Sequence, residues 1–204
     1  MSYEQMQNNK VRLTGKIASE PQFSHEIMGE GFYDLTLAVK RLSGQEDMIP
    51  ITISERLMEG ESLEIGNLIG VIGQLRSYNK YVENKSKLVL RVFVRELAEP
   101  YEDEPNTIEI DGFVCKQPVY RTTPFKREIA DMLIAVNRAY NKSDYIPAIA
   151  WGRNARYAGS FDVGERVRIV GRIQSRVYQK QLDDGVIEER TAYEVSVSKL
   201  DVLV

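Results

Sequence analysis

Aromatic rings and guanidinium groups gather between positions 138 and 180, and their spacing indicates that they share one face of a sheet. Because side chains alternate along a β-strand, the run YIPAIAW at 145–151 would place Tyr145, Ile149 and Trp151 together, with small apolar residues on the opposite face. The first set is suited to contact a ligand, and the second is suited to a core.

The run RVRIVGRIQSR at 166–176 separates in the same way. Its apolar residues share one parity, and the opposite parity, which Tyr178 continues if no bulge intervenes, carries Arg166, Arg168, Arg172, Gln174 and Arg176. A strand face of rings and arginines can stack on exposed bases while it neutralises phosphates. The leading hypothesis from these residues is therefore nucleic-acid binding.

The positive charge of the chain is concentrated in this stretch. The 204 residues have a formal net charge of −3, whereas positions 138–180 hold nine Lys or Arg against three acids, a local net of +6. Such a contrast inside an acidic chain indicates a surface for a polyanion. A basic surface that serves solubility alone is the alternative interpretation.

The composition is that of an ordinary globular protein, with 43% hydrophobic and 28% charged residues. The single cysteine, Cys115, cannot form an intramolecular disulfide, which fits a reducing cytosol. Residues 1–10 are polar and lack an apolar signal core, and no stretch is long and apolar enough to span a bilayer. We therefore expect a cytoplasmic protein, associated with the nucleoid if its ligand is DNA, and no membrane partner.

An internal repeat organises the chain. VRLTG at 11–15 matches IEIDG at 108–112 at an offset of 97, and the same offset relates LAV at 37–39 to IAV at 134–136. After one inserted residue, an offset of 98 relates Gly73 to Gly171 and Ser77 to Ser175. Because the register persists along both copies, the sequence predicts a tandem duplication.

Each copy reads as five short alternating strands with a short helix after the third, predicted at 56–62 and 153–160. Asp184-Gly185 is typical of a hairpin turn between the last two strands. This order is that of the OB-fold, a five-stranded Greek-key barrel. We therefore predict an all-β chain of two tandem OB-folds.

The boundary between the copies is expected at 99–105, an acidic segment that two prolines bound. Proline lacks the amide donor that a central strand needs, and like charges resist packing. The predicted domains are 1–98 and 106–204.

The second copy resembles a known family. LIAVNR at 133–138, YIPAIAWGR at 145–153, VGERVRIVGRIQSR at 163–176 and TAYEVSVSKL at 191–200 are similar, in this order, to the bacterial single-stranded DNA-binding protein family. In that family bases stack on four aromatic positions of each OB-fold. The resemblance places these positions on Tyr140, Tyr145, Trp151 and Tyr178. The alternative is that Tyr145 and Trp151 only cap the barrel or pack under a loop.

We expect the phosphates of a bound strand to follow the basic residues around these rings, namely Arg138, Arg153, Arg168, Arg172, Arg176 and Lys180. Binding should be independent of sequence, because every base offers a π-face. RNA is not distinguished from DNA by stacking alone, since stacking does not read the 2′-hydroxyl.

The first copy departs from this pattern. The positions equivalent to the four rings are Ser43, Met48, Ser54 and Lys80. The face equivalent to the arginine strand is apolar and reads Leu68, Gly70, Ile72 and Gln74. An exposed apolar face often marks a protein interface, so we expect the first copy to be mainly a scaffold or dimerisation domain, with residual contacts at Tyr78 and Tyr81.

The resemblance also implies an assembly. Family members with two OB-folds per chain assemble as dimers, so a homodimer with four barrels is expected. Family members usually end in a disordered stretch with an acidic tip that recruits replication and repair enzymes. Here the sequence stops at LDVLV, at 200–204, so no recruiting tip is expected.

Catalysis finds little support in the sequence. His25 lies in a loop-like region with no second His or Cys nearby, and metal-ligand spacing is absent. Gly29 and Gly31 lack the further glycine of a phosphate-binding loop. The acids at 183–184 and 188–189 are expected to decorate a hairpin. We therefore predict no enzymatic activity, no metal and no cofactor.

Two other functions remain open at this stage. A protein-interaction or primosome-assembly factor, with secondary DNA contact, is favoured by the acidic total charge and the apolar face of the first copy. A nuclease would need clustered carboxylates, which the pattern does not provide.

Overall fold

The chain was analysed as a computed structural model that describes residues 8–82, 85–181 and 185–203. The first copy contains β1 (Asn9–Ile17), β2 (Gln22–Ile27), β3 (Glu30–Lys40), β4 (Glu46–Ser54), α1 (Glu55–Met58), β5 (Leu68–Val82) and β6 (Lys85–Ala98). The second contains β7 (Asn106–Val114), β8 (Val119–Thr122), β9 (Glu128–Arg138), a 3₁₀ turn (Ala139–Asn141), β10 (Lys142–Trp151), α2 (Arg153–Ala158), β11 (Arg166–Gln181) and β12 (Ile187–Val202). Strands and helices thus follow one order in both copies.

Each copy closes into a barrel of five strands. In the first, β1 pairs with β3 and with β5, and β4 and β6 complete the ring; in the second, β7 pairs with β9 and β11, and β10 and β12 complete it. β4–β6 and β10–β12 are the parallel pairs. The predicted fold class, two tandem OB-folds, is confirmed, and we call these copies the first and the second barrel.

Two features of the secondary structure were not predicted. β2 and β8 add a sixth strand to each copy, paired only with β3 and β9 at the edge. Every residue of both strands is exposed, so they show none of the burial alternation that reveals a strand in sequence. The helix predicted at 56–62 is a single turn, Glu55–Met58, and α2 ends at Ala158.

The cores occupy the same parities in the two barrels. Leu37, Ile51 and Val71 are fully buried in the first, and Ile134 and Ile169, the counterparts of Leu37 and Val71, are fully buried in the second. The β-branched and leucine side chains of alternate positions fill each barrel, as expected for strands with one face inside.

Gly73 and Gly171 mark the point where each barrel bends. The register of β5 against β6 shifts between Ile72 and Gly73, and that of β11 against β12 shifts between Val170 and Gly171. A Cβ at Gly171 would lie 2.2 Å from the Ser196 carbonyl oxygen, so the backbones approach too closely for a side chain. The matched glycines of the repeat therefore have one structural cause.

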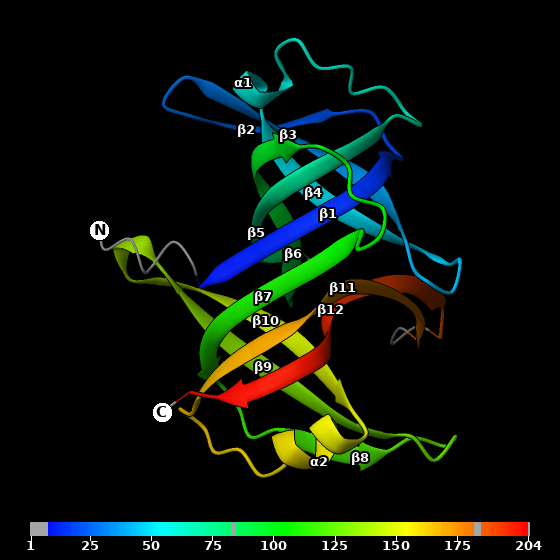
Figure 1. Cartoon of the computed structure of the whole chain (residues 1–204), viewed down its shortest axis with the longest axis vertical. Helices are drawn as coiled ribbons and strands as arrows, with labels where there is room; N and C mark the ends of the chain where they lie inside the picture. The colour runs from blue at the N-terminus through cyan, green and yellow to red at the C-terminus, as the bar shows by residue number, and fades with distance from the viewer. Residues whose placement is uncertain (1–7, 83–84, 182–184, 204) are drawn as a thin grey trace.

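The barrels are joined edge to edge. β1 pairs antiparallel with β7, with Val11 opposite Ile108, and the described strands form one continuous sheet of 12 strands (Figure 1). Residues 99–105 form no strand and run beside β1, where the Tyr101 amide donates to Thr14 Oγ1 at 2.9 Å.

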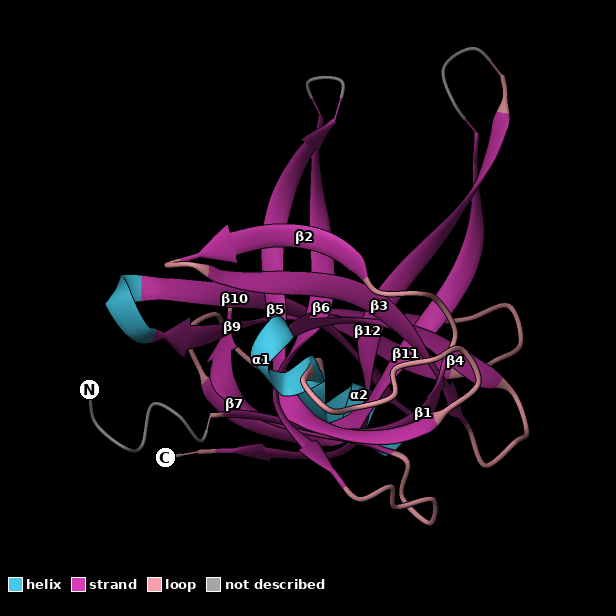
Figure 2. Cartoon of the chain, turned by 90° about the horizontal axis from the view of Figure 1, so that it is seen from above, coloured by secondary structure: helices cyan, strands magenta, loops and turns pink. Residues whose placement is uncertain are grey.

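The hairpins β5–β6 and β11–β12 extend well beyond the barrels and rise on the same side of the molecule (Figure 2). The turn predicted at 184–185 falls partly outside the described residues, which resume at Gly185; the acids at 183–184 also lie outside them. Among the described residues, no helix is long and apolar enough to cross a membrane.

Candidate nucleic-acid interface

The predicted rings lie on the outer surface of the second barrel. Their exposed fractions are 85% for Tyr140, 43% for Tyr145, 36% for Trp151 and 36% for Tyr178. These values leave ring surface free for stacking, whereas a ring that only filled the core would be sealed.

Trp151 lies at the end of β10 and is fixed to the neighbouring strand. Its Nε1–H donates to Ser196 Oγ on β12 at 3.1 Å. Ser196 in turn lies opposite Arg172 of β11 in the antiparallel register. The outward faces of β10, β12 and β11 are therefore continuous from Trp151 to Arg172.

The β10 face differs in one residue from the expectation. Ile149 shares the parity of Tyr145 and Trp151 but is buried. It lies where β10 pairs with β12, opposite Ser196, so the neighbouring strand covers it. An alternating pattern gives the direction of a side chain and not whether a neighbour shields it.

β11 carries the predicted basic row and the fourth ring. The Arg176 guanidinium lies over the Tyr178 ring, 5.8 Å from its centroid. β11 itself keeps its alternation through Tyr178, because the register shift at Gly171 puts the additional residue, Ser198, on β12. No bulge therefore intervenes on β11, and Tyr178 keeps the parity of Arg172 and Arg176.

Tyr140 is held in a different way. It lies in the 3₁₀ turn between β9 and β10 with a φ of 60°, in the left-handed region that non-glycine residues seldom adopt. The turn projects this ring from the barrel, and it is the most exposed of the four.

Three of the six predicted basic residues have acidic neighbours that positions 138–180 do not supply. Arg168 lies 3.6 Å from Glu109 of β7, and Arg176 lies 3.9 Å from Glu194 of β12. Arg172 lies 3.8 Å from Asp47, which belongs to the first barrel. The surplus of positive charge counted along 138–180 is therefore smaller in space, because pairing strands bring in acids from elsewhere.

The remaining three basic residues differ among themselves. Arg138 Nη1 contacts Asp144 Oδ1 at 3.3 Å, within the same stretch. Arg153 begins α2 and Lys180 lies near the end of β11; both are exposed, and neither forms an ion pair within the part of the chain that the structure describes. Exposed ion pairs contribute only about 0–1 kcal/mol, so a phosphate can compete for Arg168, whose partner Glu109 is exposed. Arg138 and Arg172 differ, because their partner carboxylates are buried.

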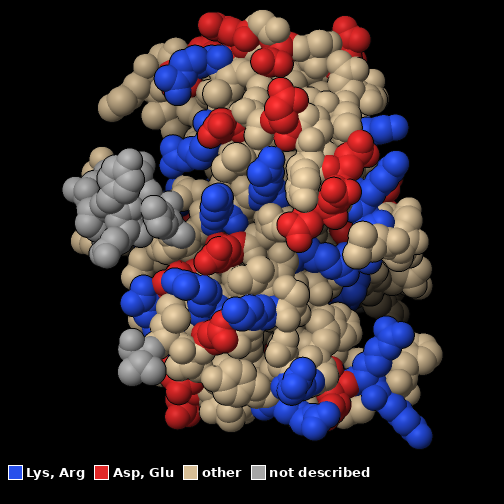
Figure 3. Space-filling model, in the orientation of Figure 1, with Lys and Arg blue, Asp and Glu red and all other residues tan. Residues whose placement is uncertain are grey.

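One face of the molecule shows this mixing directly. In Figure 3, Lys and Arg atoms alternate with Asp and Glu atoms over both barrels, so that face has no uninterrupted basic wall.

The first barrel lacks the ring set, as predicted, since Ser43, Met48, Ser54 and Lys80 occupy the equivalent positions. An aromatic residue that the sequence analysis overlooked lies on its outer face instead. Phe93 occupies the position of Ser196, beside Thr52 of β4, and contacts Phe32 with 5.6 Å between ring centroids. The apolar face of β5 is partly covered: Leu68 is exposed, Ile72 is half-buried and Gly70 is buried.

Two buried aspartates, which the sequence analysis counted only as acids, hold the barrels together. Asp47 Oδ1 accepts the Ser175 backbone N–H at 2.7 Å, and Asp144 Oδ1 accepts the Ser77 backbone N–H at 2.7 Å. Both carboxylates are completely buried. The pairs are equivalent under the internal repeat, so each barrel reaches into the hairpin of the other.

Burial by itself raises the pKa of the Asp47 carboxyl, but hydrogen bonds from Arg41 and Ser175 outweigh it and leave that pKa below its usual value. Conversely, the hydrogen bond to Asp47 raises the pKa of Arg41. Asp47 is therefore a charged group inside the junction. Burial also lowers the pKa of Arg76, against the opposing effect of Asp144.

No group of three or more His, Cys, Asp or Glu side chains that could hold a metal ion occurs among the described residues. The geometry is that of an OB-fold protein, with rings and guanidinium groups on the outside of one barrel and a buried polar junction to the other.

Comparisons with known proteins agree with this class. Residues 105–203 match the Single-strand binding protein family. The chain is 27% identical over 195 residues to the single-stranded DNA-binding protein of Thermus thermophilus, covering 81% of this chain and 74% of that protein. Single-stranded DNA-binding protein 1 of Staphylococcus aureus is 31% identical over 83 residues, 37% of this chain and 50% of that protein.

Two solved structures of the single-stranded DNA binding protein from Thermus aquaticus are similar over nearly the whole chain. The wild-type structure has a TM-score of 0.68 and 25% identity and covers 96% of this chain and 93% of that one. A deletion mutant has a TM-score of 0.73 and 22% identity, with coverages of 96% and 94%, and supports the fold. The second barrel therefore matches the single-strand binding protein family, a family of non-enzymatic binding proteins, and the whole chain has the tandem two-barrel form of the Thermus proteins.

Proposed function

We propose that this chain binds single-stranded DNA without regard to sequence, and that the second barrel supplies the principal contact surface. The observation that carries the proposal is the outward face of β10, β12 and β11, where Trp151 and Tyr178 are exposed on either side of Arg172 and Arg176. Relatives that cover most of the chain are named as single-stranded DNA-binding proteins, which supports the same ligand.

In this proposal bases stack on Tyr140, Tyr145, Trp151 and Tyr178. Each stack contributes roughly 1–3 kcal/mol and does not depend on the base. Phosphates follow Arg138, Arg153, Arg168, Arg172, Arg176 and Lys180. Because these contacts release counterions, affinity falls steeply as salt rises.

The first barrel acts in this proposal as a scaffold, and residues 99–105 divide it from the second. Its ring positions hold Ser43, Met48, Ser54 and Lys80, which cannot stack on bases. We also propose that two chains associate into a dimer with four barrels. The exposed Leu68 on β5 supports an interface there. Sedimentation equilibrium of the full chain should give twice the mass of 23.3 kDa, and a single-chain mass would contradict the dimer.

The intrinsic fluorescence of Trp151 tests the proposed ligand, because it is the only tryptophan of the chain. A thymidine homopolymer should quench this fluorescence saturably at micromolar protein, and added salt should reverse the quenching. A duplex of the same length is the control and should quench weakly. An unchanged signal on both nucleic acids would favour the protein-interaction factor instead.

A further inference from the structure

The long strand β11 continues past the strand that pairs with its free edge. β7 pairs with β11 only as far as Gly171, opposite Ile108. The next two N–H groups along that edge donate to side chains: Ile173 N–H to Asn106 Oδ1 at 2.9 Å, and Ser175 N–H to Asp47 Oδ1 at 2.7 Å. Backbone donors away from water need such partners, so these side chains substitute for a neighbouring strand.

Asn106 belongs to the second barrel itself, whereas Asp47 comes from β4 of the first. Asp47 also accepts from Ser175 Oγ at 3.2 Å and from Arg41 Nε at 2.7 Å. A completely buried carboxylate with these donors is compensated and fixed in place. The first barrel therefore holds β11 at Ser175, three residues before Tyr178.

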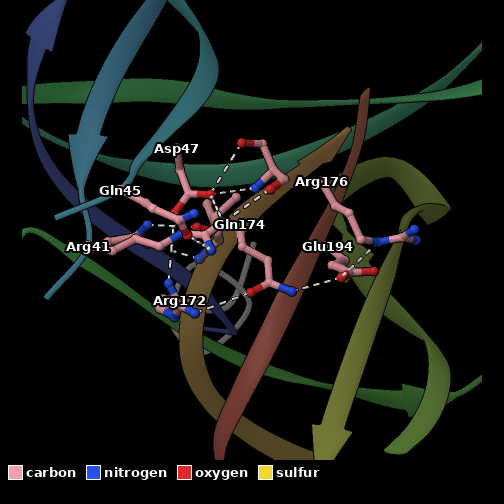
Figure 4. A network of polar contacts seen from close by, with 10 residues as sticks. Arg41, Gln45, Asp47, Arg172, Gln174, Arg176 and Glu194 are labelled. Carbon is pink, nitrogen blue, oxygen red and sulfur yellow. Dashed lines mark hydrogen bonds and ion pairs between the residues drawn. The ribbon is translucent and has the colours of Figure 1, made fainter. Parts of the chain in front are cut away.

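A chain of polar contacts continues from Asp47 to Arg176, as Figure 4 shows. Arg172 lies 3.8 Å from Asp47, and its Nη2 donates to Gln174 Oε1 at 3.3 Å. Gln174 Nε2 then donates to Glu194 Oε1 at 2.7 Å. Glu194 lies 3.9 Å from the Arg176 guanidinium, which lies over Tyr178.

The molecule contains a matched junction on the other side. Asp144 of β10 accepts the Ser77 backbone N–H at 2.7 Å and contacts Arg76 at 3.1 Å. It is as buried as Asp47. It holds the β5–β6 hairpin, where Lys80 takes the place of Tyr178.

We propose that Asp47 of the first barrel is a positioning residue for DNA binding by the second: it fixes β11 at Ser175 and Arg172 so that Tyr178 and Arg176 meet the strand. The inference rests on the proposed function and gives the first barrel a part in DNA binding that requires no contact with DNA. It also predicts that Tyr178 is coupled to Asp47 and not to the equivalent Asp144, which lies beside Arg138 instead.

The test is a double-mutant cycle on the full chain, read by thymidine-homopolymer affinity. Asp47→Asn removes the buried negative charge and turns one of the two acceptor oxygens into an NH₂ group, which then faces a donor of Arg41 or Ser175. We expect roughly tenfold weaker binding, within the range for one lost base stack. In the Asp47→Asn chain a further Tyr178→Ala should cost less than about twofold, because the ring is already misplaced.

Two controls separate positioning from a general loss of stability. Tyr140→Ala, in a turn far along the chain from this junction, should cost the same factor in the wild-type chain and in the Asp47→Asn chain. Asp144→Asn removes an equally buried carboxylate and should leave the cost of Tyr178→Ala unchanged. Equal, additive costs of Tyr178→Ala in the wild-type, Asp47→Asn and Asp144→Asn backgrounds would overturn the proposal.

Hydrogen exchange on the unmodified chain keeps the proposal testable if Asp47→Asn does not fold. The Ser175 amide should exchange slowly, like the Ser77 amide, and fast exchange of Ser175 would contradict its bond to Asp47. The outcomes also separate the two proposals. If Tyr178→Ala leaves wild-type affinity unchanged, the proposed stacking site fails; if it weakens binding but is additive with Asp47→Asn, only the positioning role fails.

Discussion

The two barrels share a backbone and differ in what they present to solvent. Both bend at a matched glycine, Gly73 or Gly171, and both receive a buried aspartate from the other barrel. On the outside, Trp151 and Tyr178 of the second barrel correspond to Ser54 and Lys80 of the first. The comparison shows that core and junction positions define the fold, while the exposed positions of the same strands are free to carry a binding surface or to lose it.

The equivalence of the two backbones can be tested at Gly73 and Gly171, where we expect the largest change in the free energy of unfolding. A Cβ would lie 2.2 Å from Ser196 O at Gly171 and 2.3 Å from Phe93 O at Gly73. Each of Gly171→Ala and Gly73→Ala should therefore cost about 3 kcal/mol of unfolding free energy, measured by denaturant titration. Gly44→Ala at an open loop tests positive-φ strain alone and should cost less. A small effect at one glycine only would show that the bends are not equivalent.

The difference between the surfaces can be tested at Tyr178 and its counterpart. Tyr178→Ala should weaken binding to a thymidine homopolymer by roughly 1–3 kcal/mol through the lost stack. Lys80→Ala, at the equivalent position of the first barrel, should change the affinity by less than about 0.5 kcal/mol. Equal losses of affinity at the two positions, measured by fluorescence titration, would mean that both barrels contact the DNA.

Charge should distinguish the barrels more weakly. Lys180, exposed near the end of β11, is proposed to meet a phosphate, so Lys180→Gln should reduce the slope of log affinity against log salt by about 1. Lys87, exposed on the first barrel's hairpin, is the matched control, and Lys87→Gln should leave the slope unchanged. If Lys87→Gln reduces this slope and Lys180→Gln does not, the single-stranded DNA contacts the first barrel instead.

The smallest effect is expected when the pH is lowered and stability is measured. Burial raises the pKa of Asp47, but its hydrogen bonds outweigh burial and leave the folded pKa below the unfolded value of about 3.9. The stabilisation is thus complete above that value and is lost as pH falls through the folded pKa. Thermal unfolding between about pH 5 and 3 should show a shallower loss of stability for Asp47→Asn than for wild type. Parallel curves would mean that Asp47 does not titrate with folding.

The repeat and its alternation predict the barrels well, because core positions have a period that sequence displays directly. The repeat also pairs Gly73 with Gly171, and the structure shows that both lie where the barrels bend. By contrast, β2 and β8 are wholly exposed edge strands, so they lack the burial alternation that marks the core strands, even though the VYRT run of β8 favours a strand.

The junction could not be predicted for a different reason. The pairing of β1 with β7 and the reach of Asp47 to Ser175 join residues that are far apart in sequence, so no local pattern encodes them. The same limit affected the charge count, since Glu109, Asp47 and Glu194 reach the arginines only through the fold. The exposure of Tyr145, Trp151 and Tyr178 was predictable from alternation, whereas Tyr140, which lies in a turn, was indicated by the family resemblance alone.

Photochemical crosslinking tests the central claim most directly. An oligothymidine carrying photoreactive bases is irradiated with the full chain, and the crosslinked peptides are identified by mass spectrometry. The account predicts crosslinks in peptides that contain Tyr145, Trp151 and Tyr178, which excess unlabelled oligothymidine removes. Crosslinks confined to the first barrel, at Phe93, Tyr78 or Tyr81, would contradict it.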